Sequence, residues 1–270
     1  MASAVFECFF VYSYRYLIPG AFLFDACYIP FMNRKNIDRL RRSELWIFDA
    51  DDTLWESALY FRRAEEDFVS LMESLGFQPE LIRDQVHQRD IERLAVTGYG
   101  ARPYMETLRG IIEEKVSTIT PYIVDSIEYI SNCLLHHPLV LLPGVLKTLQ
   151  RMHDAGKTML VYTMGEEDHQ RDKFNRSGIA PFFRELIVVP VKTEETMKEL
   201  LASTGVSPEK ACMIGNSPRS DINPAIGCSV NALYFKRALT WQAEQTEFAE
   251  PGLVTTVTCI SDILKLSGID

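Results

Sequence analysis

The chain has 270 residues, of which 47% are hydrophobic and 24% are charged, and its formal net charge at pH 7 is −9. This length allows one large domain, or a core domain that carries a smaller insert. The negative charge repels nucleic acid and anionic membranes, so we expect neither as a partner. It also repels phosphorylated ligands at long range, so a phosphate site needs local positive charge from a metal ion or from lysines.

The cysteines are scattered along the chain and none belongs to a CxxC pair. This spacing suggests neither a zinc cluster nor a disulfide framework, and reduced thiols in a cytoplasmic protein are the simplest interpretation. The six residues are Cys8, Cys27, Cys133, Cys212, Cys228 and Cys259.

Residues 1–32 contain ten of the 29 aromatic residues. Charged residues and the pair Pro19-Gly20 interrupt the apolar stretch, so no uncharged run approaches the roughly 18 residues of a membrane helix. The first residues lack a basic cluster, which makes a signal peptide a poor fit. We expect residues 1–43 to form an N-terminal extension outside the fold, with disorder as the first expectation. An added packing segment and a targeting role stay open for residues 1–32.

The regular pattern begins at residue 44. The apolar run Leu45–Phe48 ends in acidic residues and predicts a buried strand. Residues 56–138 show helical periodicity instead, punctuated by glycine and proline, and we expect an all-helical insert there.

From residue 139 onward, apolar runs alternate with helical patterns. We expect strands at 158–162, 186–189, 211–214, 230–234 and 253–257, and helices at 145–155, 166–177, 194–203 and from 221. This alternation predicts an α/β core, a Rossmann-like parallel sheet covered on both faces. Ligands of such sheets bind at the carboxyl ends of the strands.

Asp49 and Asp51 stand at the end of the first strand. In an extended segment residues i and i+2 point the same way, so two carboxylates are crowded together. A hard divalent cation such as Mg²⁺ removes that repulsion. The alternative is a solvated acidic turn.

Lys192 supplies the complementary charge, because it follows the apolar run at 186–191. A lysine beside an aspartate holds it ionised and neutralises a transferring phosphoryl group. An exposed loop lysine is the alternative, and Lys198 is the competing candidate, although it falls within a helical pattern.

Polar groups also follow two other strands. Thr163, with Met164 after it, offers a hydroxyl and backbone amides as an anion cradle, or else a simple helix cap. Asn216 and Asp221 follow the strand at 211–214, and their oxygens suit a metal shell. Asp221 at the start of a helix is the alternative interpretation.

These residues resemble the motifs of the haloacid dehalogenase (HAD) superfamily. The first motif, DxDx(T/V), stands here as the segment from Asp49 to Thr53. The second matches Thr163, the third Lys192, and the fourth the sequence GNSPRSD that ends in Asp221. The resemblance implies a Rossmann-like core at residues 44–55 and 139–270. It also implies that residues 56–138 form a helical cap of the C1 type.

The resemblance further implies roles for the site residues. Asp49 would be the nucleophile, and Asp51 would protonate the leaving alcohol and then activate water. Thr163, Met164 and Lys192 would bind the phosphoryl group. Mg²⁺ would be held by Asp49, the Asp51 carbonyl, Asp221 and Asn216. The second aspartate favours a phosphatase or a phosphomutase over a dehalogenase.

Two features depart from the family pattern. Asn216 stands where many members carry a carboxylate, which implies a lower metal affinity, and no proline follows Lys192. The segment at 97–103 is a candidate specificity loop in which Arg102 meets a second anionic group, or else a plain interhelical turn.

We therefore predict a Mg²⁺-dependent phosphomonoesterase that acts on a small phosphorylated metabolite through an aspartyl-phosphate, as a monomer or a homodimer. A phosphomutase of the same fold and a non-catalytic binding protein are the alternative hypotheses.

Overall fold

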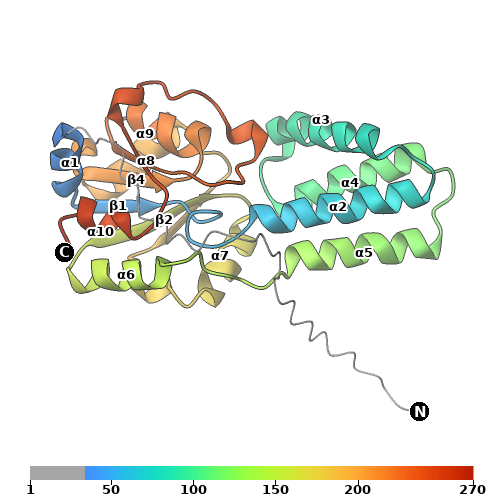
Figure 1. Cartoon of the computed structure of the whole chain (residues 1–270), viewed down its shortest axis with the longest axis horizontal. Helices are drawn as coiled ribbons and strands as arrows, with labels where there is room; N and C mark the ends of the chain where they lie inside the picture. Colours follow the sequence, from blue (N-terminus) through green and yellow to red (C-terminus); the bar gives the residue numbers. More distant parts are fainter. Residues whose placement is uncertain (1–33, 270) are drawn as a thin grey trace, which may run out of the picture.

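The computed structural model describes residues 34–269, apart from the side chains of residues 95–97. The predictions made for residues 1–32 lie outside this range. The described chain forms an α/β core and an elongated bundle of four helices that extends from one end of it (Figure 1). No helix within residues 34–269 is long and apolar enough to cross a membrane.

The core is built on one sheet of six parallel strands in the order β3-β2-β1-β4-β5-β6. All six predicted strands are present, and the Rossmann-like α/β prediction is confirmed. β1 pairs with β2 on one side and with β4 on the other. Strands β2 and β3 are therefore added on one side of β1 and strands β4 to β6 on the other, which makes β1 the topological switch point of the sheet. The strands are β1 (Leu45–Phe48), β2 (Thr158–Met164), β3 (Leu186–Val189), β4 (Ala211–Gly215), β5 (Asn231–Phe235) and β6 (Val254–Val257).

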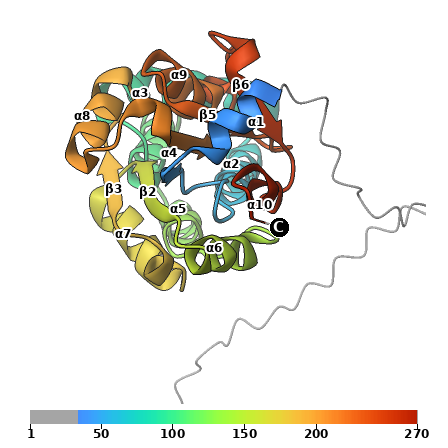
Figure 2. The same ribbon diagram turned by 90° about the vertical axis from the view of Figure 1, so that its left-hand side faces the viewer.

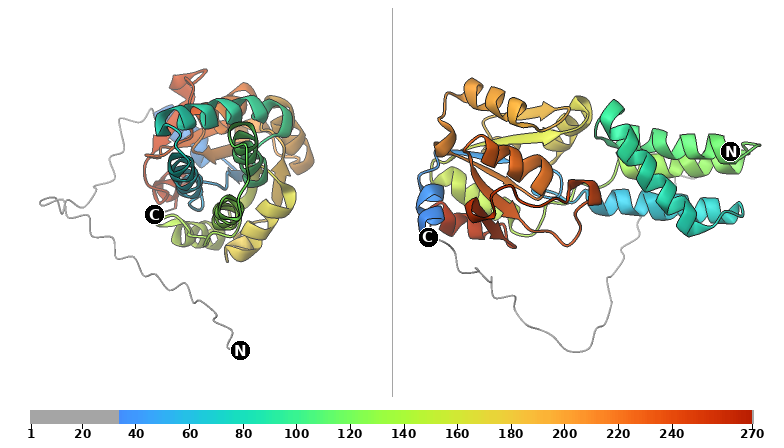
Figure 3. Two further views of the ribbon diagram at one scale, coloured as in Figure 1. Left: turned by 90° about the vertical axis from the view of Figure 1, so that its right-hand side faces the viewer. Right: turned by 90° about the horizontal axis from the view of Figure 1, so that it is seen from above.

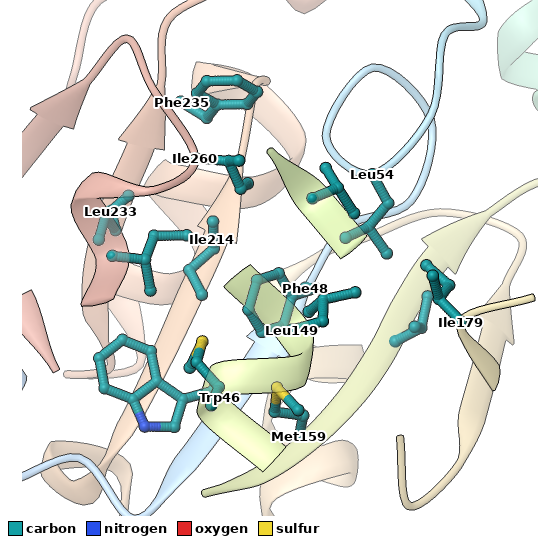
Figure 4. Packing of buried hydrophobic residues seen from close by; sticks show 14 of the residues in the cluster. Trp46, Phe48, Leu54, Leu149, Met159, Ile179, Ile214, Leu233, Phe235 and Ile260 are labelled. Carbon is teal, nitrogen blue, oxygen red and sulfur yellow. The ribbon is translucent and has the colours of Figure 1, made fainter. Parts of the chain in front are cut away.

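Helices cover both faces of the sheet (Figure 2). Side chains of α1, α6, α7 and α10 pack on one face, and side chains of α8 and α9 on the other. On the first face Trp46, Phe48 and Leu149 form part of a continuous apolar cluster (Figure 4). The helices are α1 (Arg34–Arg41), α6 (Val145–Asp154), α7 (Glu167–Arg176), α8 (Glu194–Thr204), α9 (Asn223–Gly227) and α10 (Asp262–Leu266).

Helix α1 lies within the segment that we expected to be an extension outside the fold. Leu40 is 2% exposed and belongs to the same cluster as Trp46. The expected start of the core at residue 44 is therefore too late. The helix was hard to see in the sequence because only Leu40 of its eight residues is buried.

The insert between β1 and β2 consists of four helices with an apolar core of their own (Figure 3). Helix α3 is inclined across the others, and its buried side chains include Ile82 and Val86. This thin apolar stripe explains why the sequence showed periodicity for its neighbours but not for α3. The helices are α2 (Ala58–Ser74), α3 (Pro79–Thr97), α4 (Ala101–Lys115) and α5 (Pro121–Leu135).

The two segments that connect the insert to the core run side by side. Trp55 and Leu141 form an antiparallel bridge, and the Leu142 amide donates to the Leu54 carbonyl at 3.0 Å. Asp52, which has a positive φ of 61°, accepts hydrogen bonds from the first amides of α2 at 2.9 to 3.0 Å. These contacts hold the insert over the carboxyl ends of β1 and β2.

Candidate active site

A cavity of about 330 Å³ lies between the strand ends and the helical insert. The sheet contributes its floor through residues at the carboxyl end of β2 and residues that follow β1, β3 and β4. Of the eight candidate site residues predicted from the sequence, all except Arg102 line this cavity. The seven are Asp49, Asp51, Thr163, Met164, Lys192, Asn216 and Asp221.

Lys192 is the centre of the floor. Its Nζ lies 2.6 Å from Asp49 Oδ1 and 2.6 Å from Asp221 Oδ1, and all three side chains are almost completely buried. Lys198, the competing candidate, is exposed and pairs with Glu194 one turn away on α8, at 3.2 Å. The structure therefore places Lys192, and not Lys198, beside Asp49.

One ammonium group faces two buried carboxylates at this point. Burial alone would lower the pKa of Lys192, but the Asp221 and Asp49 carboxylates outweigh it and raise that pKa, so the lysine stays charged. Burial raises the pKa of Asp49, and it raises the pKa of Asp221 to about 7, against the opposing effect of Lys192. A single positive charge does not neutralise both acids when both are ionised. The floor then keeps a net negative charge that a further cation would balance.

Two neighbouring groups fix the orientation of these carboxylates. Thr53 Oγ1 donates to Asp49 Oδ2 at 3.0 Å and to Asn216 Oδ1 at 3.2 Å. The Ser217 amide donates to Asp221 Oδ2 at 3.0 Å. A Cβ atom on Gly215 would lie 2.1 Å from Asp221 Oδ2, so only glycine at the end of β4 leaves space for this carboxylate.

Asp51 points away from Asp49 and toward helix α7. Lys173 Nζ lies 2.6 and 2.8 Å from its two oxygens, and Gln170 Nε2 and Trp55 Nε1 donate to it at 2.8 and 2.6 Å. Burial raises the pKa of Asp51, but Lys173 and the two hydrogen-bond donors outweigh burial and lower it to about 2. The carboxylate is therefore ionised and fully engaged in this arrangement.

Lys173 and Gln170 were missed by the sequence interpretation. Lys173 is 2% exposed on α7, a position where a lysine needs an anionic partner. Its spacing of three residues from Gln170 places both on one face of the helix. That spacing was the only available signal, and it did not indicate Asp51 as the partner.

The residues of the floor suit Mg²⁺ by their chemistry. Within residues 34–269 no three acidic, histidine or cysteine side chains gather to hold a metal ion, and the Asp51 carboxylate is turned to Lys173. Magnesium needs only one or two carboxylates, with waters and substrate oxygens in its remaining positions. Asp49 and Asp221, the Asp51 carbonyl and the Asn216 amide oxygen offer such a set. The unbalanced charge of the two acids supports this fit.

Thr163 and Met164 form the next part of the floor. Strand β2 extends to Met164, so Thr163 is the next-to-last residue of the strand rather than a residue after it. Its side chain is buried. Among the described residues 34–269, Thr163 Oγ1 has only a long contact of 3.5 Å, to the Met164 carbonyl. Its hydroxyl therefore has hydrogen-bonding capacity left for a ligand in the cavity.

Arg102 lies outside the cavity. Its guanidinium donates to Glu166 at 2.6 Å and to Asp168 at 3.0 and 3.1 Å, at the start of α7. It thereby joins the first turn of α4 in the insert to the core. The hypothesis that Arg102 meets a second anionic group of the ligand stays a prediction.

The insert side of the cavity contains aromatic and acidic residues. Tyr99, in the loop between α3 and α4, packs edge to face against Trp241 of the core, with ring centroids 5.9 Å apart. Its hydroxyl donates to Glu244 Oε1 at 2.5 Å. Trp241 and Glu244 also line the cavity, and no motif in the sequence indicated either residue.

Comparisons with known proteins agree with this geometry. Residues 44–228 match the family model described as haloacid dehalogenase-like hydrolase. Among curated proteins, a glyceraldehyde 3-phosphate phosphatase of Methanopyrus kandleri is 26% identical over 187 residues, which cover 66% of this chain and 78% of that protein.

Solved structures show the same fold. A haloacid dehalogenase-like hydrolase of Xanthomonas campestris has a TM-score of 0.67 and 28% identity, over 78% of this chain and 88% of its own. The putative HAD-hydrolase YfnB of Bacillus subtilis, bound to magnesium, has a TM-score of 0.58 and 14% identity, over 84% and 100% of the two chains. The family match spans the insert and strands β1 to β4 of the sheet. The chain therefore belongs to the haloacid dehalogenase-like hydrolase family of enzymes.

Proposed function

We propose that this hydrolase is a Mg²⁺-dependent phosphomonoesterase that acts on a small phosphorylated metabolite through an aspartyl-phosphate at Asp49. The observation that carries the proposal is the position of the Asp49 carboxylate. It lies on the floor of a 330 Å³ cavity, 2.6 Å from a buried lysine and beside a second buried acid. A phosphoryl group that enters this cavity meets a nucleophile and a positive charge together.

In the first step an oxygen of Asp49 attacks phosphorus, and the bond from phosphorus to the ester oxygen breaks. Lys192 and the Thr163 hydroxyl hold the phosphoryl oxygens, while Met164 lines the same side of the cavity. Asp51, once it has left Lys173 and taken up a proton from solvent, gives that proton to the leaving alcohol. Asp49, the Asp51 carbonyl, Asn216 and Asp221 would hold Mg²⁺, which when bound would supply electrostatic stabilisation of the phosphoryl charge.

In the second step Asp51 takes a proton from water, whose oxygen attacks phosphorus. The bond between Asp49 and phosphorus breaks, and inorganic phosphate leaves. The acid and base roles require the Asp51 carboxylate to leave Lys173 and turn toward the cavity. We infer that movement of the helical insert as a cap accompanies this rotation, because Asp51 and the connection to α2 share one short turn.

The comparisons support a phosphate ester as the substrate. The Methanopyrus relative is a glyceraldehyde 3-phosphate phosphatase, a protein that acts on a small phosphorylated sugar. The size of the cavity suits a phosphate with a leaving group of a few carbon atoms. The presence of Asp51, which can protonate an alcohol, favours ester cleavage over dehalogenation.

The test is phosphate release from a panel of esters that includes glyceraldehyde 3-phosphate, phosphoglycolate and hexose phosphates, with and without Mg²⁺. We expect release that depends on Mg²⁺ and is lost in Asp49→Asn, with a fall of at least about 1,000-fold. Equal rates in the wild type and Asp49→Asn would overturn the nucleophile assignment. Isomerisation of a hexose phosphate without net phosphate release would favour the phosphomutase alternative instead.

A further inference from the structure

Glu244 is a buried carboxylate with three hydroxyl partners. It is 7% exposed, and its partners are the hydroxyls of Tyr99, Ser217 and Ser220. Tyr99 belongs to the helical insert, whereas the two serines belong to the segment that follows β4, Ser217 just before and Ser220 within the short helical turn Pro218–Ile222. The Glu244 side chain therefore contacts both the roof of the cavity, which the helical insert forms, and its floor, which the strand ends and the segments after them form.

The two serines lie within the segment that orients the floor. The Ser217 amide donates to Asp221 Oδ2 at 3.0 Å, and the Ser220 amide donates to Ser217 Oγ at 2.9 Å. Asn216 precedes Ser217 directly. A displacement of the Glu244 carboxylate therefore alters the support of the turn that carries Asn216 and Asp221.

Tyr99, the partner from the insert, lies on a loop whose backbone conformation lets it approach the core closely. Gly98 and Gly100 flank Tyr99 and have φ values of 74° and 146°, which other residues rarely adopt. Burial and the Glu244 charge raise the pKa of Tyr99, so its hydroxyl keeps the proton that it donates. The edge-to-face contact with Trp241 holds the tyrosine ring in line with Glu244.

We propose that Glu244 is a positioning residue that couples docking of the Tyr99 loop to the geometry of the Asn216–Asp221 turn. The proposal rests on the phosphatase function proposed above and extends it to a residue that does not touch the reacting atoms. When Tyr99 binds Glu244 Oε1, the carboxylate is held so that Oε2 accepts both serine hydroxyls. Loss of the Tyr99 hydroxyl leaves the carboxylate free to turn, and the turn beneath it loses its support.

The first experiment compares Tyr99→Phe, Ser220→Ala and the double variant in steady-state assays. Each single variant removes one hydroxyl that donates to a buried carboxylate, an interaction strong enough to expect an approximately 10-fold fall in kcat/KM. The expected signature is a rise in the Mg²⁺ concentration for half-maximal activity in Tyr99→Phe, although Tyr99 is on the insert. A tyrosine that only packs against the substrate would change the KM of the ester alone.

The double variant separates coupling from two independent contacts. Because both hydroxyls act through one carboxylate, we expect the double variant to be about as impaired as the worse single variant. In a Glu244→Gln background the Tyr99 and Ser220 substitutions should have little further effect. Multiplicative losses in the wild-type background, or an unchanged Mg²⁺ requirement in Tyr99→Phe, would overturn the proposal.

A second measurement does not depend on activity. Hydrogen–deuterium exchange of the full chain should show faster exchange of the amides of residues 217–222 in Tyr99→Phe than in the wild type. The matched control is Tyr122→Phe, which changes an exposed tyrosine of the insert and should leave that segment unaltered. Unchanged exchange in Tyr99→Phe would contradict the coupling, whereas absent phosphate release in the wild type would contradict only the proposed function.

Discussion

The floor and the roof of the cavity are built in different ways. The floor is a set of buried charges tied together by short ionic contacts, with Lys192 between Asp49 and Asp221. The roof belongs to a bundle with its own apolar core, and it reaches the floor through the paired connections to α2 and α5 and through the loop at residues 98–102.

This difference separates two tasks. In the proposed function the charges of the floor would hold the phosphoryl group, and their positions follow from the ends of the strands. The roof would determine which leaving groups fit, and a small number of separate contacts join it to the core. Changes to the floor should therefore affect every substrate, while changes to the roof should affect substrates unequally. The following predictions test this comparison from the largest expected effect to the smallest.

Replacing Lys192 by methionine should have the largest effect. It leaves Asp49 and Asp221 buried without their shared partner, which should lower the free energy of unfolding by about 3–5 kcal/mol. The kcat/KM value should fall by at least about 100-fold for every ester of the panel. Urea unfolding and phosphate release measure the two effects. Lys198→Met is the matched control, because that lysine is exposed on α8, and we expect neither quantity to change.

Gly100→Ala should alter the roof directly, and it reaches the floor only through the contact of Tyr99 with Glu244. Gly100 has a φ of 146°, and a Cβ atom there would lie 2.8 Å from Glu166 Oε2, so either the loop or the Glu166 side chain must shift. We expect kcat/KM to fall by about 10-fold, by different factors for different esters. Gly76→Ala is the control, since its φ of 93° is equally unfavourable but nothing lies within 4 Å. Both should lose about 1 kcal/mol of stability, and an equal loss of activity in Gly76→Ala would contradict the special role of the loop.

Asp90 gives the roof a pH dependence of its own. It lies on α3 beside the cavity, near His87 and Glu65, and burial raises its pKa from 3.8 to about 6. The folded state therefore holds this proton more tightly than the unfolded state, so Asp90 should reduce stability as the pH rises from about 4 to 6.

Asp90→Asn should abolish that dependence. We expect the variant and the wild type to have similar stability near pH 4. At pH 7 the variant should be more stable by about 1–2 kcal/mol, after allowance for the partial exposure of the carboxylate. Thermal or urea unfolding between pH 4 and pH 7 measures the difference. A variant that is less stable than the wild type at pH 7 would show that Asp90 has a stabilising partner there.

Arg102→Ala should have the smallest effect. The guanidinium is half exposed and binds Glu166 and Asp168 rather than the cavity, so its contacts are screened by solvent. We expect KM to change by less than about threefold for singly and doubly anionic esters. A rise of 10-fold or more that is confined to esters with a second anionic group would instead support the hypothesis that Arg102 binds the substrate. Asp168→Asn is the control that weakens the same ion pair without removing the arginine.

The sequence by itself determined the strands and the residues at their ends. A short apolar run that stops at a polar residue favours a buried strand, and this pattern located Asp49, Thr163 and Asp221. The helices α2, α4 and α5 followed from apolar residues repeated at helical spacing. The limits of this signal are seen in α1 and α3, whose buried stripes are too thin to stand out.

Only the tertiary structure decided the partners of these residues. Lys173 lies 122 residues from Asp51 along the chain, and Glu244 lies 145 residues from Tyr99. Such pairs depend on how helices pack against a sheet and on how an insert sits over it, and periodicity carries no information about either. The choice between Lys192 and Lys198 has the same origin. Both lysines follow β3, but burial between two carboxylates is a property of the folded sheet rather than of the local sequence.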